Sequence, residues 1–168
     1  MQRVLSILPT LALPCLSGCI SVVADAQAGF VSSTRFEKQR IGGAAQVAGG
    51  FNIGSDTDAE HFGPGLDARA KVTRDIQQVG VGPHLYWLSS SWVSPYARLG
   101  TTLVELGRVD DAFSVGALGP RAELGFFHSG FVVSTYAEWD LRWTEQKNEG
   151  FVGLNIGVGH ALSSAFVH

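Results

Sequence analysis

Charged side chains are scarce in this chain of 168 residues. It has 12 Lys and Arg and 15 Asp and Glu, together 16% of the sequence, against about 25% in an average soluble domain. Hydrophobic residues make up 45%, the mean hydropathy is +0.15 and the net charge is −3. This combination excludes intrinsic disorder, which requires low hydrophobicity and high net charge. Twelve scattered basic residues also fail to make the basic patch of a nucleic-acid-binding protein.

Cysteine is missing from the body of the chain, because both cysteines, Cys15 and Cys19, lie near the start. A disulfide framework is therefore excluded. Beyond this first segment no stretch approaches the ~20 apolar residues of a membrane-spanning helix. The 21 glycines follow no every-third-residue period, which excludes a collagen-like chain.

The N-terminal segment has the features of an export signal. Met1–Arg3 supplies a positive start, and an apolar run over 4–15 follows. Leu16–Cys19 (Leu-Ser-Gly-Cys) matches a bacterial lipobox, in which the cysteine becomes the lipidated first residue. Ala24–Ala26 (Ala-Asp-Ala) instead fits ordinary signal peptidase, with cleavage after its last residue. We predict a signal peptide within residues 1–26 and one domain over 27–168, and both cleavage sites stay open.

The rest of the chain alternates with a period of two, which is typical of β-strands. In residues 131–143 the odd positions are mostly apolar and the even positions mostly polar. Short connections favour antiparallel neighbours. The sequence predicts an all-β, antiparallel up-and-down β-barrel of about eight strands, with one β-bulge at Gly119–Pro120 where the alternation switches. The strands are expected near 29–38, 42–53, 65–73, 76–88, 94–107, 112–126, 131–143 and 151–162.

The two faces of these strands indicate a membrane-type barrel. The polar face is rich in glycine and carries few, nearly balanced charges, which suits a narrow lumen better than a solvated wall. His84 and Tyr86 share this lumen face. Trp87, Trp139 and Trp143 lie on the apolar face near strand ends, as an interfacial aromatic girdle would. The predicted lumen ion-pair network comprises Arg69, Lys71, Arg98, Arg121, Glu123, Glu138, Asp140 and Arg142.

The C-terminal half resembles a known family. Val93–Gly100 (Val-Ser-Pro-Tyr-Ala-Arg-Leu-Gly), Ala122–Phe127 and the two strands that follow resemble small outer-membrane barrels of the OmpA/OmpX-like kind, over about residues 76–162. The resemblance implies an eight-stranded barrel among outer-membrane lipids, inserted by the outer-membrane insertion machinery, with both termini in the periplasm. Three features depart from the family: the long Ser55–Pro64 segment, the lipobox, and a C-terminus that runs past the last strand.

These patterns predict a non-enzymatic outer-membrane barrel with a structural, envelope-integrity role and at most a narrow pore. One alternative is a soluble lipoprotein barrel that faces the periplasm and binds an apolar ligand. Another is a lipid-modifying barrel enzyme, but the chain has no His-x-Ser, and His128 and Ser129 are adjacent in a turn. We expect no cofactor and no metal site, and we interpret the acidic residues at 56–61 as a solvated loop, because their spacing is not that of an EF-hand.

Overall fold

The computed structural model describes residues 19–34, 40–54, 60–89, 91–116, 119–142 and 147–164. Within these ranges no helix is long and apolar enough to cross a membrane. The strands are β1 (Cys19–Ser33), β2 (Ile41–Gly54), β3 (Glu60–Thr73), β4 (Ile76–Ser89), β5 (Ser94–Thr102), β6 (Val104–Val109), β7 (Ala112–Gly116), β8 (Gly119–His128), β9 (Phe131–Arg142) and β10 (Lys147–Ser164).

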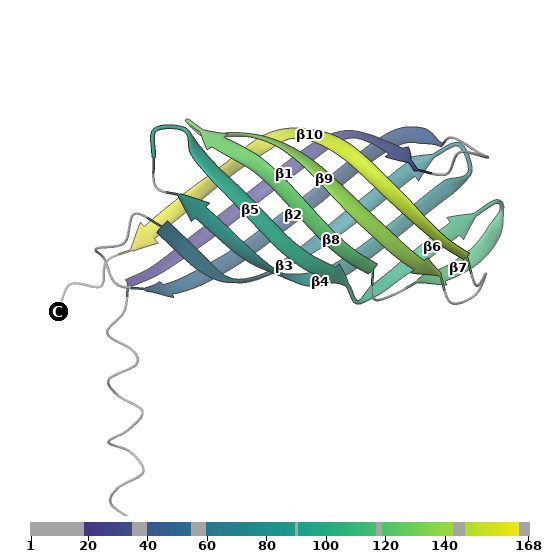
Figure 1. Ribbon diagram of the computed structural model, residues 1–168, viewed down its shortest axis with the longest axis horizontal. Helices are drawn as coiled ribbons and strands as arrows, with labels where there is room; N and C mark the ends of the chain where they lie inside the picture. Colours follow the sequence, from purple (N-terminus) through teal and green to yellow (C-terminus); the bar gives the residue numbers. More distant parts are fainter. Residues whose placement is uncertain are drawn as a thin grey trace, which may run out of the picture.

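The strands form one closed antiparallel barrel (Figure 1). The order is β10-β1-β2-β3-β4-β5-β8-β9, and the pairing of β9 with β10 closes the wall. β6 continues β5 along β4, while β7 leads into β8 and meets β9, so the wall has eight positions. The predicted eight-stranded up-and-down barrel is confirmed. We call the end where β1 starts and β10 finishes the N-terminal end, and the opposite one the Arg40 end (left and right in Figure 1).

The first strand is longer and earlier than the sequence suggested. The expected start near residue 29 is wrong, because β1 begins at Cys19 and pairs with β10 and β2 from Ile20 onward. The alternation was hidden because this stretch directly continues the apolar run of the export signal. Val23, Asp25 and Gln27 are buried, while the residues between them face outward. Residues 19–26 are therefore the first half of a barrel strand.

Two irregularities reverse which side chains face inward. Leu103 is an extra residue between β5 and β6, and its N–H donates to the Val81 carbonyl oxygen at 2.9 Å. This is a β-bulge, after which Glu105 points inward. The second switch lies between Gly116 and Gly119, both buried, which is slightly earlier than the Gly119–Pro120 position expected from the sequence.

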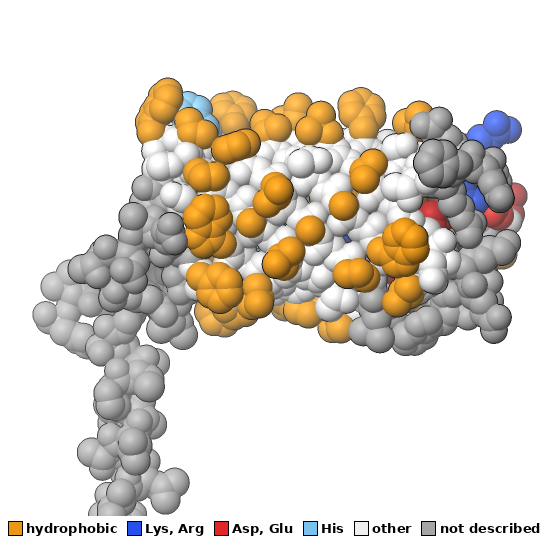
Figure 2. Space-filling view, in the orientation of Figure 1, with side chains coloured by type: hydrophobic (Ala, Val, Ile, Leu, Met, Phe, Trp, Pro, Cys, Tyr) orange, Lys and Arg blue, Asp and Glu red, His pale blue; other side chains and the backbone are white. Residues whose placement is uncertain are grey.

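Large apolar side chains cover the outer wall, as Figure 2 shows for one face. Phe30, Leu66 and Ile156 are 73%, 69% and 60% exposed, and the charged side chains of that view gather at the Arg40 end. Inside, the larger buried apolar residues of the described strands form two clusters. One comprises Val23, Tyr86, Leu88, Tyr96, Phe127 and Val132, and the other Val31, Ile76, Val109, Tyr136 and Phe151.

Glycines make room for the aromatic rings of the lumen. Tyr96 lies opposite Gly125, where a Cβ would come within 2.5 Å of the ring, and Tyr136 lies opposite Gly153, where the distance would be 2.3 Å. A Cβ on Gly65 would come within 2.3 Å of His84 Nε2. The glycine-rich face is thus the packed interior of the barrel, since each ring lies directly against the backbone of a neighbouring strand.

Candidate functional site: the barrel lumen

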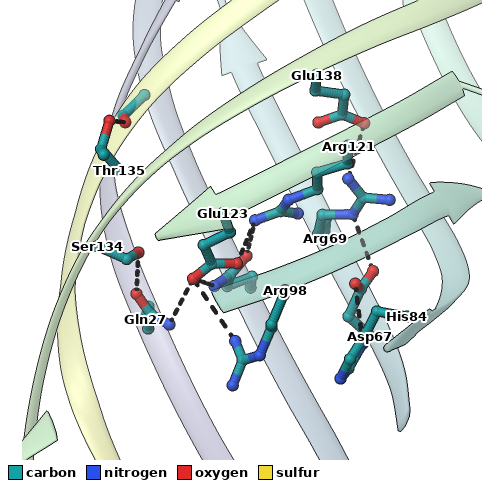
Figure 3. A network of polar contacts seen from close by, with 12 residues as sticks. Gln27, Asp67, Arg69, His84, Arg98, Arg121, Glu123, Ser134, Thr135 and Glu138 are labelled. Atoms are coloured by element: carbon teal, nitrogen blue, oxygen red, sulfur yellow. Dashed lines mark hydrogen bonds and ion pairs between the residues drawn. The ribbon is translucent and has the colours of Figure 1, made fainter. Parts of the chain in front are cut away.

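A first cluster of buried charges, the Glu123 cluster, comprises Asp25, Arg98, Arg121 and Glu123. Arg98 forms a bidentate pair with Asp25, with Nη1–Oδ1 at 3.3 Å and a second, closer contact between Nη2 and Oδ2. Its Nη1 also lies 3.5 Å from Glu123 Oε1, while Arg121 Nη2 lies 3.0 Å from Glu123 Oε2. The four residues come from β1, β5 and β8, so the cluster crosses the lumen. Figure 3 shows Arg98 and Arg121 directed at Glu123.

Neutral side chains add further hydrogen bonds to Glu123 in this cluster. Glu123 Oε1 accepts from Tyr96 Oη at 2.7 Å, from Gln46 Nε2 at 2.9 Å and from Gln27 Nε2 at 3.1 Å. Ser134 Oγ in turn donates to Gln27 Oε1 at 2.7 Å. A buried carboxylate with this many donors is held in its charged form and in one position.

The second cluster, the Lys71 cluster, comprises Asp67, Arg69, Lys71, Glu105, Glu138 and Asp140. Arg69 bridges Asp67 (Nε–Oδ1, 3.0 Å) and Glu138 (Nη1–Oε1, 2.9 Å), and it donates to Thr102 Oγ1 at 2.6 Å. These charged residues are all at least nine-tenths buried. Arg69 and Lys71 come from β3 and reach residues of β6 and β9, so this cluster also ties distant strands together.

Three carboxylates surround Lys71. One oxygen each of Glu105, Glu138 and Asp140 lies within 4.8 Å of the others, an arrangement that could hold a metal ion. Lys71 Nζ, however, lies 2.7 Å from Glu105 Oε1 and 3.6 Å from Glu138 Oε1, and it also donates to Asp140 Oδ2. The ammonium group therefore occupies the position that a cation would take.

Ion pairs fill most of the described lumen and leave little open space in it. The buried charged side chains are five bases (Arg40, Arg69, Lys71, Arg98 and Arg121) and seven acids (Asp25, Asp67, Glu105, Glu123, Glu138, Asp140 and Glu149). A cavity between the two clusters has a volume of about 10 Å³, close to the smallest space that holds one water molecule. The larger apolar hollow, of about 390 Å³, lies on the outer wall between Leu99 and Trp139.

The predicted lumen residues are thus found as follows. Arg69, Lys71, Arg98, Arg121, Glu123, Glu138 and Asp140 are buried and ion-paired. Arg142 ends β9, and its side chain lies outside the described residues. His84 and Tyr86 are both buried, with ring centroids 6.4 Å apart, and His84 Nδ1 lies 3.3 Å from Asp67 Oδ2. His84 therefore belongs to the lumen network.

The aromatic residues of the outer wall include one that the sequence analysis left out. Trp139 is 46% exposed and Trp87 is half-buried, whereas Trp143 lies outside the described residues. Trp92, at the N-terminal end, is 84% exposed, and its ring lies 4.6 Å from that of His128. His128 Nδ1 lies 3.1 Å from the Trp92 carbonyl oxygen, and the contact between Ser129 Oγ and His128 Nε2 is long, at 3.4 Å. His128 therefore links the β8–β9 turn, which also contains Ser129, to the β4–β5 connection.

Sequence reasoning also missed four charged residues of the lumen. Asp25 lay in the expected export signal, and Glu105 lay in the expected strand 94–107 but was assigned to neither face, because the bulge at Leu103 was not foreseen. Arg40 and Glu149 lay in presumed connections, yet both are buried. The first two could have been found by following the alternation upstream of residue 29 and by noting that an acid interrupts the apolar face after Leu103.

The acidic segment 56–61 lies largely outside the described residues. Glu60 begins β3, and the side chains of residues 56–61 are not described. The interpretation as a solvated loop is wrong for Glu60 and His61, because both lie in β3 and pair with β4, and it stays a prediction for residues 56–59.

Solved structures share this fold. Neisserial surface protein A superposes with a TM-score of 0.50 at 17% identity, over 83% of this chain and 95% of that chain. Ail, the attachment invasion locus protein of Yersinia pestis, gives 0.44 at 13% identity in complex with the heparin analogue sucrose octasulfate, and 0.41 at 14% in another structure; both matches cover 86% of this chain and 100% of that chain. No protein-family model and no curated protein matches the sequence. The chain has the fold of the small eight-stranded outer-membrane β-barrels.

Proposed function

We propose that this protein is an outer-membrane β-barrel with a structural, envelope-integrity role, no enzymatic activity and a lumen closed to all but the smallest ions. The observation that carries this proposal is the inversion of the wall, with apolar side chains outside and ion pairs inside. An outer wall of this kind is stable in hydrocarbon, and barrel closure satisfies the backbone hydrogen bonds there. The fold shared with Neisserial surface protein A supports the same reading.

Fractionation of a Cys19→Ser variant tests membrane insertion, because this variant has no lipid tether to retain it. We expect the variant to stay in the membrane fraction through high salt and carbonate, and to migrate faster on a gel when unheated. Release into the soluble fraction would instead favour the lipoprotein that binds an apolar ligand. Two observations in the described lumen are against that alternative: ion pairs cross it, and the cavity between the two clusters has room for about one water molecule.

Conductance measurements test the closed lumen. In planar bilayers we expect the full barrel to give no stable open level of the kind produced by a water-filled porin, because the Glu123 and Lys71 clusters cross the lumen. Large, stable single-channel steps would contradict the proposal. The enzymatic alternative requires a nucleophile and a base in contact with a third group. The contact between Ser129 and His128 is long, at 3.4 Å, and lies in the β8–β9 turn, where the other ring nitrogen of His128 contacts the Trp92 carbonyl oxygen.

We also infer that export processing leaves residues 19–26 in the mature protein, which favours the lipobox. Cleavage after Ala26 would remove Asp25, the bidentate partner of Arg98, and Val23 of the N-terminal apolar cluster. It would also remove half of the pairing between β1 and its neighbours. Cleavage before Cys19 removes none of these contacts and places the lipidated residue directly at the start of β1.

Intact-mass measurement of the protein isolated from membranes distinguishes the two sites. We expect a chain that starts at Cys19 and carries acyl groups. Cys19→Ala should abolish the acylation. A mature chain starting at Gln27 would contradict the inference, and it would leave Arg98 without Asp25.

A further inference from the structure

One arginine links the strand ends around the Arg40 end of the barrel. Arg40 precedes β2 and is 5% exposed. Its Nη1 lies 2.8 Å from Glu149 Oε2, its Nη2 lies 2.7 Å from Asp110 Oδ2, and its Nε lies 3.9 Å from Asp75 Oδ2. These acids belong to β10, to the β6–β7 turn and to the β3–β4 turn. With Arg40 itself, which lies between β1 and β2, a single guanidinium joins three strand connections and the start of β10.

Shorter-range contacts support this linkage. Ser33 at the end of β1 donates through Oγ to Glu149 Oε1 at 2.6 Å, and its N–H donates to the Arg40 carbonyl oxygen at 2.8 Å. The N–H of Asp110 donates to the Asp75 carbonyl oxygen at 2.8 Å. Arg40 therefore connects two strand-end pairs that are each already joined by hydrogen bonds.

An apolar layer lies next to these charges along the same strands. It comprises Val31, Ile76, Val109 and Phe151, all 0–1% exposed and in one cluster. Ile76 directly follows Asp75, Val109 directly precedes Asp110, and Phe151 lies two residues after Glu149. The ring of Phe151 is in turn contacted by Lys71, whose Nζ lies 4.4 Å from its centroid. The apolar layer thus separates the Arg40 contacts from the Lys71 cluster.

We propose that Arg40 is a latch that holds this end of the barrel closed. When its contacts are lost, Asp75, Asp110 and Glu149 lose the cation that they share, the strand ends that carry the apolar layer separate, and the Lys71 cluster becomes accessible to water. The contact of Arg40 with Asp110 is the most sensitive to screening by salt, because the Asp110 side chain is 48% exposed, whereas the Glu149 side chain is 1% exposed. The proposal goes beyond a closed barrel, since it states which end opens and which residue prevents it.

A buried cysteine reports the opening. Ser114 lies opposite Gly107 in the β6–β7 hairpin, is 0% exposed, and its Oγ has no hydrogen-bond partner among the described residues. Ser114→Cys is therefore a conservative change. It is placed in the full chain with Cys15→Ala and Cys19→Ala, so that it is the sole thiol. The refolded barrel in lipid vesicles is treated with a charged maleimide, and the labelling rate is measured.

Arg40→Gln is compared with Arg108→Gln, which removes the same charge from β6, next to the β6–β7 turn. Arg108 is exposed and makes a long 3.4 Å contact with the Asp111 carbonyl oxygen. We expect labelling to accelerate at least tenfold in Arg40→Gln and to stay at the parental rate in Arg108→Gln. Equal rates in Arg40→Gln and its parent, or equal acceleration in both variants, would overturn the latch.

A second measurement applies if Arg40→Gln fails to fold, as judged by its gel mobility without heating. The parental Ser114→Cys barrel is then labelled in 0.1 M and 1 M NaCl, between which the screening length falls from about 10 Å to about 3 Å. Asp110→Asn, which removes the exposed arm, is measured beside it. We expect severalfold faster labelling in high salt and in Asp110→Asn. A rate that neither change alters would refute the proposal.

Discussion

Leu154→Arg decides between a wall that faces hydrocarbon and a wall that faces water. Leu154 is 52% exposed and lies in β10, five residues from Glu149 at the Arg40 end and five from Gly159, whose N–H donates to the Gly130 turn at the N-terminal end. A rise of about 3.3 Å per residue and a strand tilt of about 40° give roughly 2.5 Å per residue along the barrel axis. Leu154 is therefore about 12 Å from either end, at the middle of a belt about 25 Å tall.

The expected cost follows from this depth. An arginine at the midplane of a barrel wall destabilises by about 2–4 kcal/mol, whereas near the interface the cost falls to about 0–1 kcal/mol. The midplane cost corresponds to a loss of roughly 30- to 700-fold in the folding equilibrium constant at about 1.4 kcal/mol per factor of ten. On a water-facing wall the same exposed substitution would stay within about 0.5 kcal/mol.

Ile41→Arg is the matched control. Ile41 is also aliphatic and outward-facing, at 64% exposure, but it is the first residue of β2, at the Arg40 end. Urea unfolding of both variants in phospholipid vesicles, followed by tryptophan fluorescence and by gel mobility without heating, gives the two free energies. Equal and small losses in the two variants would refute a membrane-embedded wall.

Three further changes test the interior. Arg98→Met leaves Asp25 and Glu123 without their shared arginine, so urea titration should show a free energy of unfolding lower by about 3–5 kcal/mol. Adding Asp25→Asn should restore part of this loss. Strictly additive losses from the two substitutions would contradict the pairing. Lys71→Met should lower the free energy of unfolding by a similar amount, since three carboxylates lose their shared partner. Adding Glu105→Gln should restore part of that loss. An unchanged free energy of unfolding in Lys71→Met would contradict the cluster. Gly153→Ala should lower the free energy of unfolding by about 1–3 kcal/mol, because its Cβ would lie 2.3 Å from the Tyr136 ring. Gly43→Ala should be neutral, because the nearest atom to its Cβ, the Gly29 carbonyl oxygen, would be 3.9 Å away. Equal thermal unfolding temperatures of the two variants would contradict this packing.

The alternation of side chains was sufficient to predict the fold and most of the lumen. Each strand reports its own two faces, so residues such as Arg69 and Glu138 could be placed inside from local sequence alone. Alternation does not tell which oppositely charged side chain each buried charged residue contacts. The contact of Lys71 in β3 with Glu105 in β6 depends on strand register around the closed barrel, which no single strand encodes.

The failures have equally local causes. One extra residue at Leu103 reverses the alternation and hides Glu105, and an apolar export signal that runs directly into β1 hides Asp25. Arg40 was invisible for another reason. Its role depends on three acids from separate connections, and connections carry no alternation that would mark a residue as buried.

The placement of apolar side chains outside and charged side chains inside follows from the hydrocarbon that we propose surrounds the wall. In hydrocarbon, burying an apolar side chain inside the barrel gains little over leaving it outside, so apolar residues alone cannot fix one register. Ion pairs such as Arg98–Asp25 and Arg69–Glu138 can, because any slip by one residue would leave a charge unpaired in the lumen or exposed to lipid. A closed, ion-filled lumen is therefore the expected interior of a barrel whose role is to stand in a membrane, and a conducting pore would require giving up the contacts that specify its structure.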